Sequence, residues 1–118
     1  MSKHNPKFDH ERLEVYQLAL RFLAVANLIA SSLPRGRSYL ADQLRRAATS
    51  IVLNIAEGAE EFKKDEKKRF YRIAKRSGAE CAAVLDVTRV ITDNLIKESV
   101  EARCLLIRIV AMLVRLSK

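Results

Sequence analysis

Two carboxylates are the side chains of this sequence best placed for acid–base or metal chemistry. Residues 50–58 read SIVLNIAEG, an apolar stretch that contains Asn54 and Glu57, and SGAE at 77–80 ends on Glu80. In a helix, residues three and four positions apart lie on one face. That spacing predicts a polar seam between apolar flanks, formed by Gln43, Arg46, Ser50, Asn54 and Glu57, with Ser77 and Glu80 as partners on the next helix.

The polar seam admits two interpretations. Glu57 and Glu80 could act as a catalytic or metal-binding carboxylate pair, with Arg46 or Arg76 neutralising either one. Alternatively, the seam is a hydrogen-bond network that fixes helix pairing, because a buried polar group without a partner costs about 1–3 kcal/mol. A metal site usually needs three or four ligands, often including histidine, and both histidines lie near the N-terminus. We therefore favour the network.

Other catalytic arrangements are missing from the sequence. It has no Glu-x-x-His pair for a di-iron bundle, no C-x-x-C-H haem motif and no glycine-rich phosphate loop. Cys81 and Cys104 lie on apolar stripes and are expected to be buried, reduced thiols. The sequence predicts no enzyme, cofactor or metal; a hydrolase that uses Glu57 and Glu80 is the minor alternative.

A basic block at residues 63–76, KKDEKKRFYRIAKR, is the best candidate for binding chemistry. The chain has 22 Lys and Arg against 14 Asp and Glu, a net charge of +8, which favours acidic partners such as nucleic acid. The alternative is a solvated helix face, salt-bridged to acidic residues nearby. Tyr71 could stack on a base. The candidate nucleic-acid-binding residues are Lys64, Lys67, Lys68, Arg69, Tyr71, Arg72, Lys75, Arg76 and Arg89.

Long helices must position these residues, because the chain has only three glycines and two prolines. The apolar periodicity predicts helices over about residues 10–33, 38–60, 64–94 and 99–117, joined by short connections. These form a single all-α domain at 9–118, an antiparallel up-down-up-down four-helix bundle, after a flexible tail at 1–8. The third helix shows one apolar stripe: Phe70, Ile73, Ser77, Cys81, Val84, Thr88, Ile91 and Leu95.

The first and fourth helices are apolar on most of their circumference. A helix in a monomeric bundle should keep one wet face, and soluble monomers seldom expose large apolar patches. We therefore expect a homo-oligomer with an interface on these two helices. Glu14 and Arg21 interrupt the apolar region 13–33, so no membrane span is expected. The polar N-terminus does not resemble a signal peptide, which predicts a cytoplasmic protein.

Four stretches carry a resemblance to a known family: LEVYQLA at 13–19, QLRRAATSIVLNIAEG at 43–58, RFYRIA at 69–74 and SGAE at 77–80. Over about residues 8–117 the chain resembles the 23S rRNA intervening-sequence proteins. The resemblance implies a bacterial four-helix bundle that assembles as a cyclic homopentamer without enzymatic activity. The positions that match are Gln43, Leu44, Arg45, Arg46, Ala47, Ser50, Asn54, Ile55, Ala56, Glu57, Gly58, Ser77 and Glu80.

The resemblance also implies two kinds of partner. Related proteins are accessory factors of diversity-generating retroelements, associated with nucleic acid and a reverse transcriptase. One hypothesis is therefore an oligomer that binds nucleic acid, with RNA favoured, through its basic surface and without strong sequence preference. The alternative is an oligomeric scaffold or adaptor whose ligand is another protein.

Overall fold

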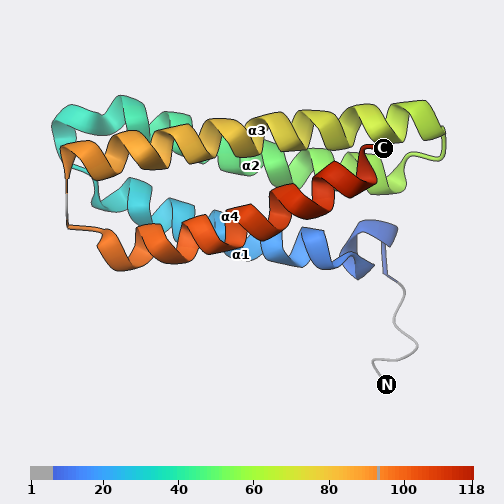
Figure 1. Cartoon of the computed structure of the whole chain (residues 1–118), viewed down its shortest axis with the longest axis horizontal. Coiled ribbons are helices and arrows are strands. Elements are labelled where there is room, and N and C mark those ends of the chain that lie inside the picture. Colours follow the sequence, from blue (N-terminus) through green and yellow to red (C-terminus); the bar gives the residue numbers. More distant parts are fainter. Residues whose placement is uncertain (1–6, 93) are drawn as a thin grey trace, which may run out of the picture.

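The computed structural model describes residues 7–118 except residue 93, and it places no strand among them. Four helices lie side by side along the length of the molecule (Figure 1). A short 3-10 turn, η2, precedes the first helix, and a second, η3, leads into the second helix. The elements in chain order are η2 Asp9–Arg12, α1 Glu14–Ser32, η3 Arg35–Arg37, α2 Ser38–Glu60, α3 Lys64–Ile91 and α4 Ile96–Leu116.

The second helix has the bounds expected from the sequence, and the other three differ at their ends. Leu13 is extended (φ −84°, ψ 129°), so it separates η2 from α1. Thr92 is also extended (φ −153°, ψ 146°), which ends α3 at Ile91, three residues early. The fourth helix begins at Ile96. Most of the predicted tail, residues 1–6, lies outside the described residues.

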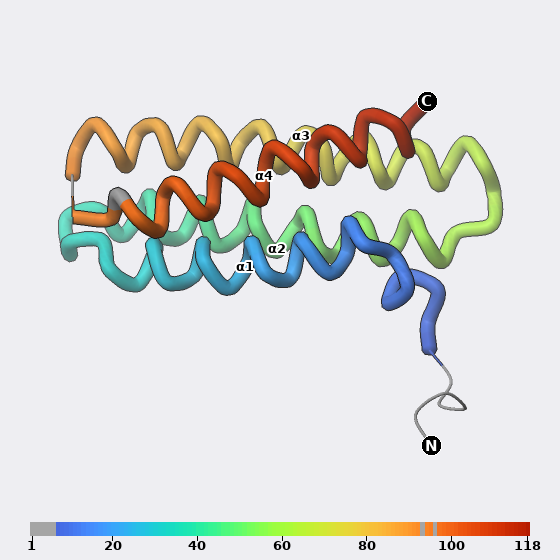
Figure 2. Tube along the Cα trace, turned by 60° about the horizontal axis from the view of Figure 1, so that its bottom comes forward, coloured from blue at the N-terminus to red at the C-terminus, as the bar shows by residue number. Residues whose placement is uncertain are grey.

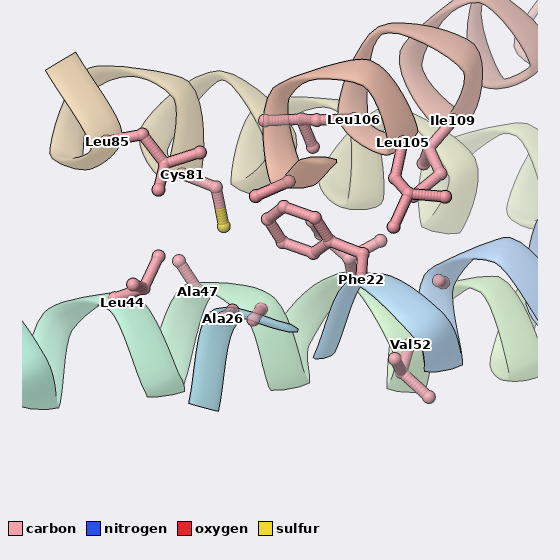
Figure 3. Close-up of a cluster of buried hydrophobic side chains, with 14 of the residues drawn as sticks. Phe22, Ala26, Leu44, Ala47, Val52, Cys81, Leu85, Leu105, Leu106 and Ile109 are labelled. Carbon is pink, nitrogen blue, oxygen red and sulfur yellow. The ribbon is translucent and has the colours of Figure 1, made fainter. Parts of the chain in front are cut away.

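All four helices contribute to one apolar core, as Figure 3 shows around Phe22. Phe22 on α1, Leu44 on α2 and Ile109 on α4 have no exposed surface. Cys81 on α3 is equally buried, and burial raises the pKa of its thiol to about 12, with a smaller contribution from Glu80. The thiol therefore stays protonated and packs as a small apolar group.

α1 is long and apolar enough to cross a membrane by length and composition alone, with a mean hydropathy of 1.3. A core helix of a globular protein meets the same test. In this fold one face of α1, which includes Val15, Leu18, Phe22 and Ile29, packs against the other helices. The apolar residues on this face of α1 therefore form part of the core of the bundle.

The buried face of α3 is displaced from the predicted stripe in its first half. Tyr71, Ala74 and Gly78 are buried, each one residue beyond the expected Phe70, Ile73 and Ser77. The displaced set contains two small residues, which let the backbone of α3 approach its neighbours closely. From Cys81 onwards the stripe is as predicted through Thr88.

A tight contact between α2 and α3 explains this rotation. A Cβ atom at Gly58 would lie 2.8 Å from Cε1 of Tyr71 and 3.2 Å from Cβ of Phe70, so only glycine fits beneath the Tyr71 ring. Lys67 Nζ donates hydrogen bonds to the carbonyls of Gly58 (2.7 Å) and Ala59 (3.1 Å). A cation at these terminal carbonyls also favours the negative end of the helix dipole.

The η2 turn is fastened to the far end of α2. His10 donates its backbone N–H to Glu60 Oε2 (3.2 Å), and its Nδ1 lies 2.8 Å from the same oxygen. Tyr16 packs edge-on against the His10 ring, with centroids 4.7 Å apart. Figure 2 shows this N-terminal segment at the same end of the bundle as the α2–α3 connection. The hydrogen bonds between His10 and Glu60 thus connect η2 to the C-terminal end of α2.

The Gly58→Ala substitution should destabilise the protein by up to about 2 kcal/mol, because the added methyl group overpacks the buried Tyr71 ring at a cost of about 1–3 kcal/mol. This cost opposes the gain of about 1 kcal/mol that alanine brings to a helix. Thermal unfolding measures the difference. Gly36→Ala is the matched control, since nothing lies within 4 Å of a Cβ there. A Gly58→Ala variant as stable as the wild type would show that the ring moves freely.

The Glu60–His10 contact should make stability depend on acid pH. Hydrogen bonds from His10 lower the pKa of Glu60 below its ordinary value of 4.5 in the folded state. The contribution to stability is therefore present above pH 4.5 and is lost as pH falls through the lowered pKa. Wild type should melt at a higher temperature than Glu60→Gln at neutral pH, and the difference should shrink as the pH falls below 4.5. A pH-independent difference would contradict this.

Candidate functional site

The polar seam brings α2 and α3 together at two points. Ser50 Oγ lies 2.8 Å from Ser77 Oγ, in a half-buried position. Asn54 Nδ2 donates to the carbonyl of Ser50 (2.9 Å) and to Ser50 Oγ (3.1 Å), so the amide bonds within its own helix and orients the serine. Further along, Gln43 Nε2 donates to Glu80 Oε2 (3.3 Å).

Two members of the predicted seam do not take part in these contacts. Arg46 and Glu57 are exposed, and neither forms an ion pair with a described residue. Arg76 does not neutralise a seam carboxylate either. Helix pairing therefore uses the neutral groups of the seam and one exposed carboxylate. Arg46 lies beside Ser50 and Asn54 at the surface, and Arg76 lines the space between α3 and α4.

Glu57 and Glu80 do not form a carboxylate pair. Glu80 contacts Gln43, whereas Glu57 follows Gln43 by fourteen residues, about 21 Å along the axis of α2. Two carboxylates that share one proton or one metal must lie within a few ångströms of each other. No group of three metal-ligating side chains occurs among the described residues. The seam thus offers no geometry for the minor hydrolase alternative.

The predicted basic face divides into structural and free cations. The expectation that Tyr71 stacks on a base is wrong, because its side chain is only 3% exposed and packs over Gly58. Lys67 is held by the carbonyls at the end of α2. Arg69 forms two hydrogen bonds of 3.1 Å with Glu66 and covers the Phe70 ring. Helix rotation explains the error, since the sequence placed Phe70 and not Tyr71 inside.

Four of the six remaining cations form a row along α3, which we call the cationic row: Lys64, Lys68, Arg72 and Arg76. The other two are Lys75 and Arg89, and Arg89 lies 3.8 Å from Asp86. The spacing of four residues within the cationic row places its members on one side of the helix. Among the described residues none of these members forms an ion pair, and Arg72 makes only a 3.4 Å hydrogen bond to the carbonyl of Ser117. Their charges are therefore available to a ligand.

A groove of about 770 Å³ runs between α3 and α4, where α4 lies oblique to α3 (Figures 1 and 2). We call it the α3–α4 groove. Small and apolar side chains line much of it: Gly78, Ala79, Ala82, Leu85, Leu106, Ile107, Val110 and Ala111. Five basic side chains, Arg72, Lys75, Arg76, Arg89 and Arg103, accompany one carboxylate, Asp86, which lies 3.8 Å from Arg89.

Arg103 is the groove residue that sequence reasoning missed. It lies on α4, outside the basic block, so local charge density did not reveal it. Its spacing contains a usable signal, because Ser99, Arg103, Leu106 and Val110 follow at intervals of four, three and four residues. That pattern places Arg103 beside residues that face α3.

The fourth helix exposes an apolar stripe, which corrects the expectation for Cys104. The buried face of α4 includes Ala102, Leu105, Ile109 and Leu113, and Cys104 points to the outside. The exposed stripe contains Val100, Cys104, Ile107, Ala111 and Val114, which alternate at four- and three-residue intervals. α1 exposes fewer large apolar side chains, notably Leu20 (38%) and Leu28 (53%).

Removing both hydroxyls of the Ser50–Ser77 contact should reveal a coupling between the two helices. We expect a double-mutant cycle with Ser50→Ala and Ser77→Ala to give a coupling energy of about 0.5–1.5 kcal/mol in urea unfolding. Glu101→Gln is the control and should leave stability unchanged, because Glu101 is exposed and forms no ion pair with a described residue. A coupling energy near zero would show that the hydroxyl contact contributes nothing to helix pairing.

Comparison with known proteins agrees with the resemblance seen in the sequence. The family model described as 23S rRNA-intervening sequence protein matches residues 11–114, which include all four helices almost entirely. No curated protein and no solved structure gave a significant match to the chain. The match covers most of the sequence and ends within α4. The chain therefore belongs to the 23S rRNA-intervening sequence protein family.

Proposed function

We propose that the chain is one subunit of a cyclic homo-oligomer of antiparallel four-helix bundles that binds nucleic acid in the cytoplasm. The oligomer has no enzymatic activity, and the family resemblance favours a pentamer and RNA as the ligand. The observation that carries the proposal is the cationic row on α3, which has no ion-pair partner among the described residues. A net charge of +8 points in the same direction.

The mode of binding follows from the kinds of side chain present. Lysine and arginine at four-residue intervals can contact successive phosphates, whose counterions are released on binding. The one aromatic residue proposed for base stacking, Tyr71, is buried. Contacts to the backbone position a nucleic acid without reading its sequence. We therefore propose binding with weak sequence preference, which repetition of the row around a ring would strengthen.

Exposed apolar surface supports the oligomer. Val100 and Ile107 on α4 are each 58% exposed and belong to the apolar stripe of that helix. Contiguous apolar surface of this kind on a small domain marks an interaction site. Gly58, near the end of α2, contacts Tyr71 in the first turns of α3. Gln43, near the start of α2, contacts Glu80 further along α3. These two contacts support an antiparallel arrangement of the helices within each subunit.

Replacing Lys64→Ala and Lys68→Ala together should weaken RNA binding by the isolated oligomer and lower its dependence on salt. Each lost phosphate contact reduces the slope of log affinity against log salt by about 1 for each subunit that is bound. Fluorescence anisotropy with a labelled RNA, at several salt concentrations, measures both effects. Light scattering on the same samples reports the mass of the protein.

A charge-matched control distinguishes the cationic row from net charge. Arg21→Ala with Arg35→Ala removes two exposed cations from other elements, and this variant should bind almost as well as wild type. Equal losses in the two variants would show that overall charge, not the row, governs binding. If the oligomer binds neither RNA nor DNA, the nucleic-acid proposal is wrong and the protein-partner alternative gains support.

A further inference from the structure

We propose that the α3–α4 groove of one copy receives the outer face of α2 from the next copy. The inference rests on the proposed homo-oligomer and adds which two surfaces meet in it. The second surface, which we call the acidic face, surrounds the last turns of α2: Phe8, His10, Leu53, Ala56, Glu57, Glu60 and Glu61. The groove is apolar and basic, whereas this face is apolar and acidic.

Among the residues that the structure describes, none covers the apolar wall of the groove. Ala82, Leu85, Leu106 and Val110 line a space of about 770 Å³. The five basic side chains around it include Lys75 on α3 and Arg103 on α4, neither of which forms an ion pair with a described residue. Asp86, the single carboxylate, already lies beside Arg89. A fitting partner therefore supplies both an apolar side chain and carboxylates.

The acidic face supplies both. Leu53 is 58% exposed and Phe8 is 68% exposed, and the two large apolar side chains lie on the same face. They line a shallow hollow of about 480 Å³ together with three carboxylates. Glu60 is engaged by His10, and Glu61 accepts a hydrogen bond from the backbone N–H of Lys63 (3.0 Å). Glu57 has no ion-pair partner among the described residues.

The two surfaces lie on different sides of the bundle. One side of α2 faces α3 through Ser50, and another faces α1 through Arg45, which donates to Asn27 Oδ1 and Ser31 Oγ (both 3.1 Å). Leu53 and Glu57 point away from both neighbours, into solvent. One subunit can therefore offer its acidic face and its groove to two different copies.

Contact between unlike patches is heterologous, and repetition of such a contact closes a ring when the rotation permits. In this arrangement Leu53 enters the apolar groove as an anchor, and the carboxylates meet the basic rim. Lys64 and Lys68 do not line the groove, so they stay available for nucleic acid. Arg72 and Arg76 belong to both the cationic row and the groove. The nucleic-acid test therefore changes only Lys64 and Lys68, and the contact test changes only Lys75 and Arg103 on the groove side, so the two proposals can be tested independently.

Charge reversal with rescue tests the contact. The groove variant carries Lys75→Glu and Arg103→Glu, and the acidic-face variant carries Glu57→Lys and Glu61→Lys. Each should raise the concentration needed for assembly at least tenfold, as measured by light scattering over a dilution series. The chain that carries all four changes should assemble again, because the reversed charges are complementary. Arg21→Glu with Lys97→Glu is the control and should assemble like wild type.

The outcomes separate the contact from the oligomer itself. A wild-type protein that is monomeric at all concentrations overturns both proposals. An oligomeric wild type whose groove and acidic-face variants keep its mass overturns the contact and leaves the oligomer standing. Failure of the four-fold variant to recover also overturns the contact. Circular dichroism checks that each variant is helical, and Leu53→Ser, which changes no charge, should independently weaken assembly.

Discussion

The close packing of α3 against α2 at Gly58 is the constraint on which the other features depend. The Tyr71 ring occupies the space that a side chain at position 58 would fill, and Lys67 binds the carbonyls beside it. Seating Tyr71 there turns α3 so that Ala74 and Gly78 follow it into the interior. In this orientation Tyr71 is buried and Lys67 binds backbone carbonyls, although the sequence predicted that both would contact a ligand. Lys64, Lys68, Arg72 and Arg76 remain on the surface.

The same rotation determines what α3 presents to α4. Gly78 lies close to Val110, since a Cβ there would be 3.0 Å from the valine Cγ2 atom, while small residues such as Ala79 and Ala82 line the space beside it. Small side chains on α3 and an oblique α4 leave a groove between the two helices (Figure 1). Its basic rim comes from both helices, so no single stretch of sequence contains it.

Polar residues inside an apolar stretch have separated into two kinds. Ser50, Asn54 and Ser77 satisfy one another at the α2–α3 boundary, which avoids the cost of burying unpaired polar groups. Glu57 and Arg46, in step with them along α2, turn outward. Residues at three- and four-residue spacing occupy a sector of the helix surface and not a single line, so some members of the seam face α3 and others face solvent. A seam drawn from spacing alone therefore combines residues of different environments.

The sequence by itself determined the helical content, the extent of α2, the burial of Cys81 and the family. These features depend on local apolar periodicity, on the scarcity of glycine and proline, and on motifs that can be read directly from the sequence. It missed the exposure of Cys104 and the burial of Tyr71, because a step of one residue changes a helical direction by about 100°. Only tertiary packing decided which of the adjacent residues Phe70 and Tyr71 is buried, because the Tyr71 ring fits against Gly58. It also separated Glu57 from Glu80, since distance across a bundle depends on how the helices are aligned.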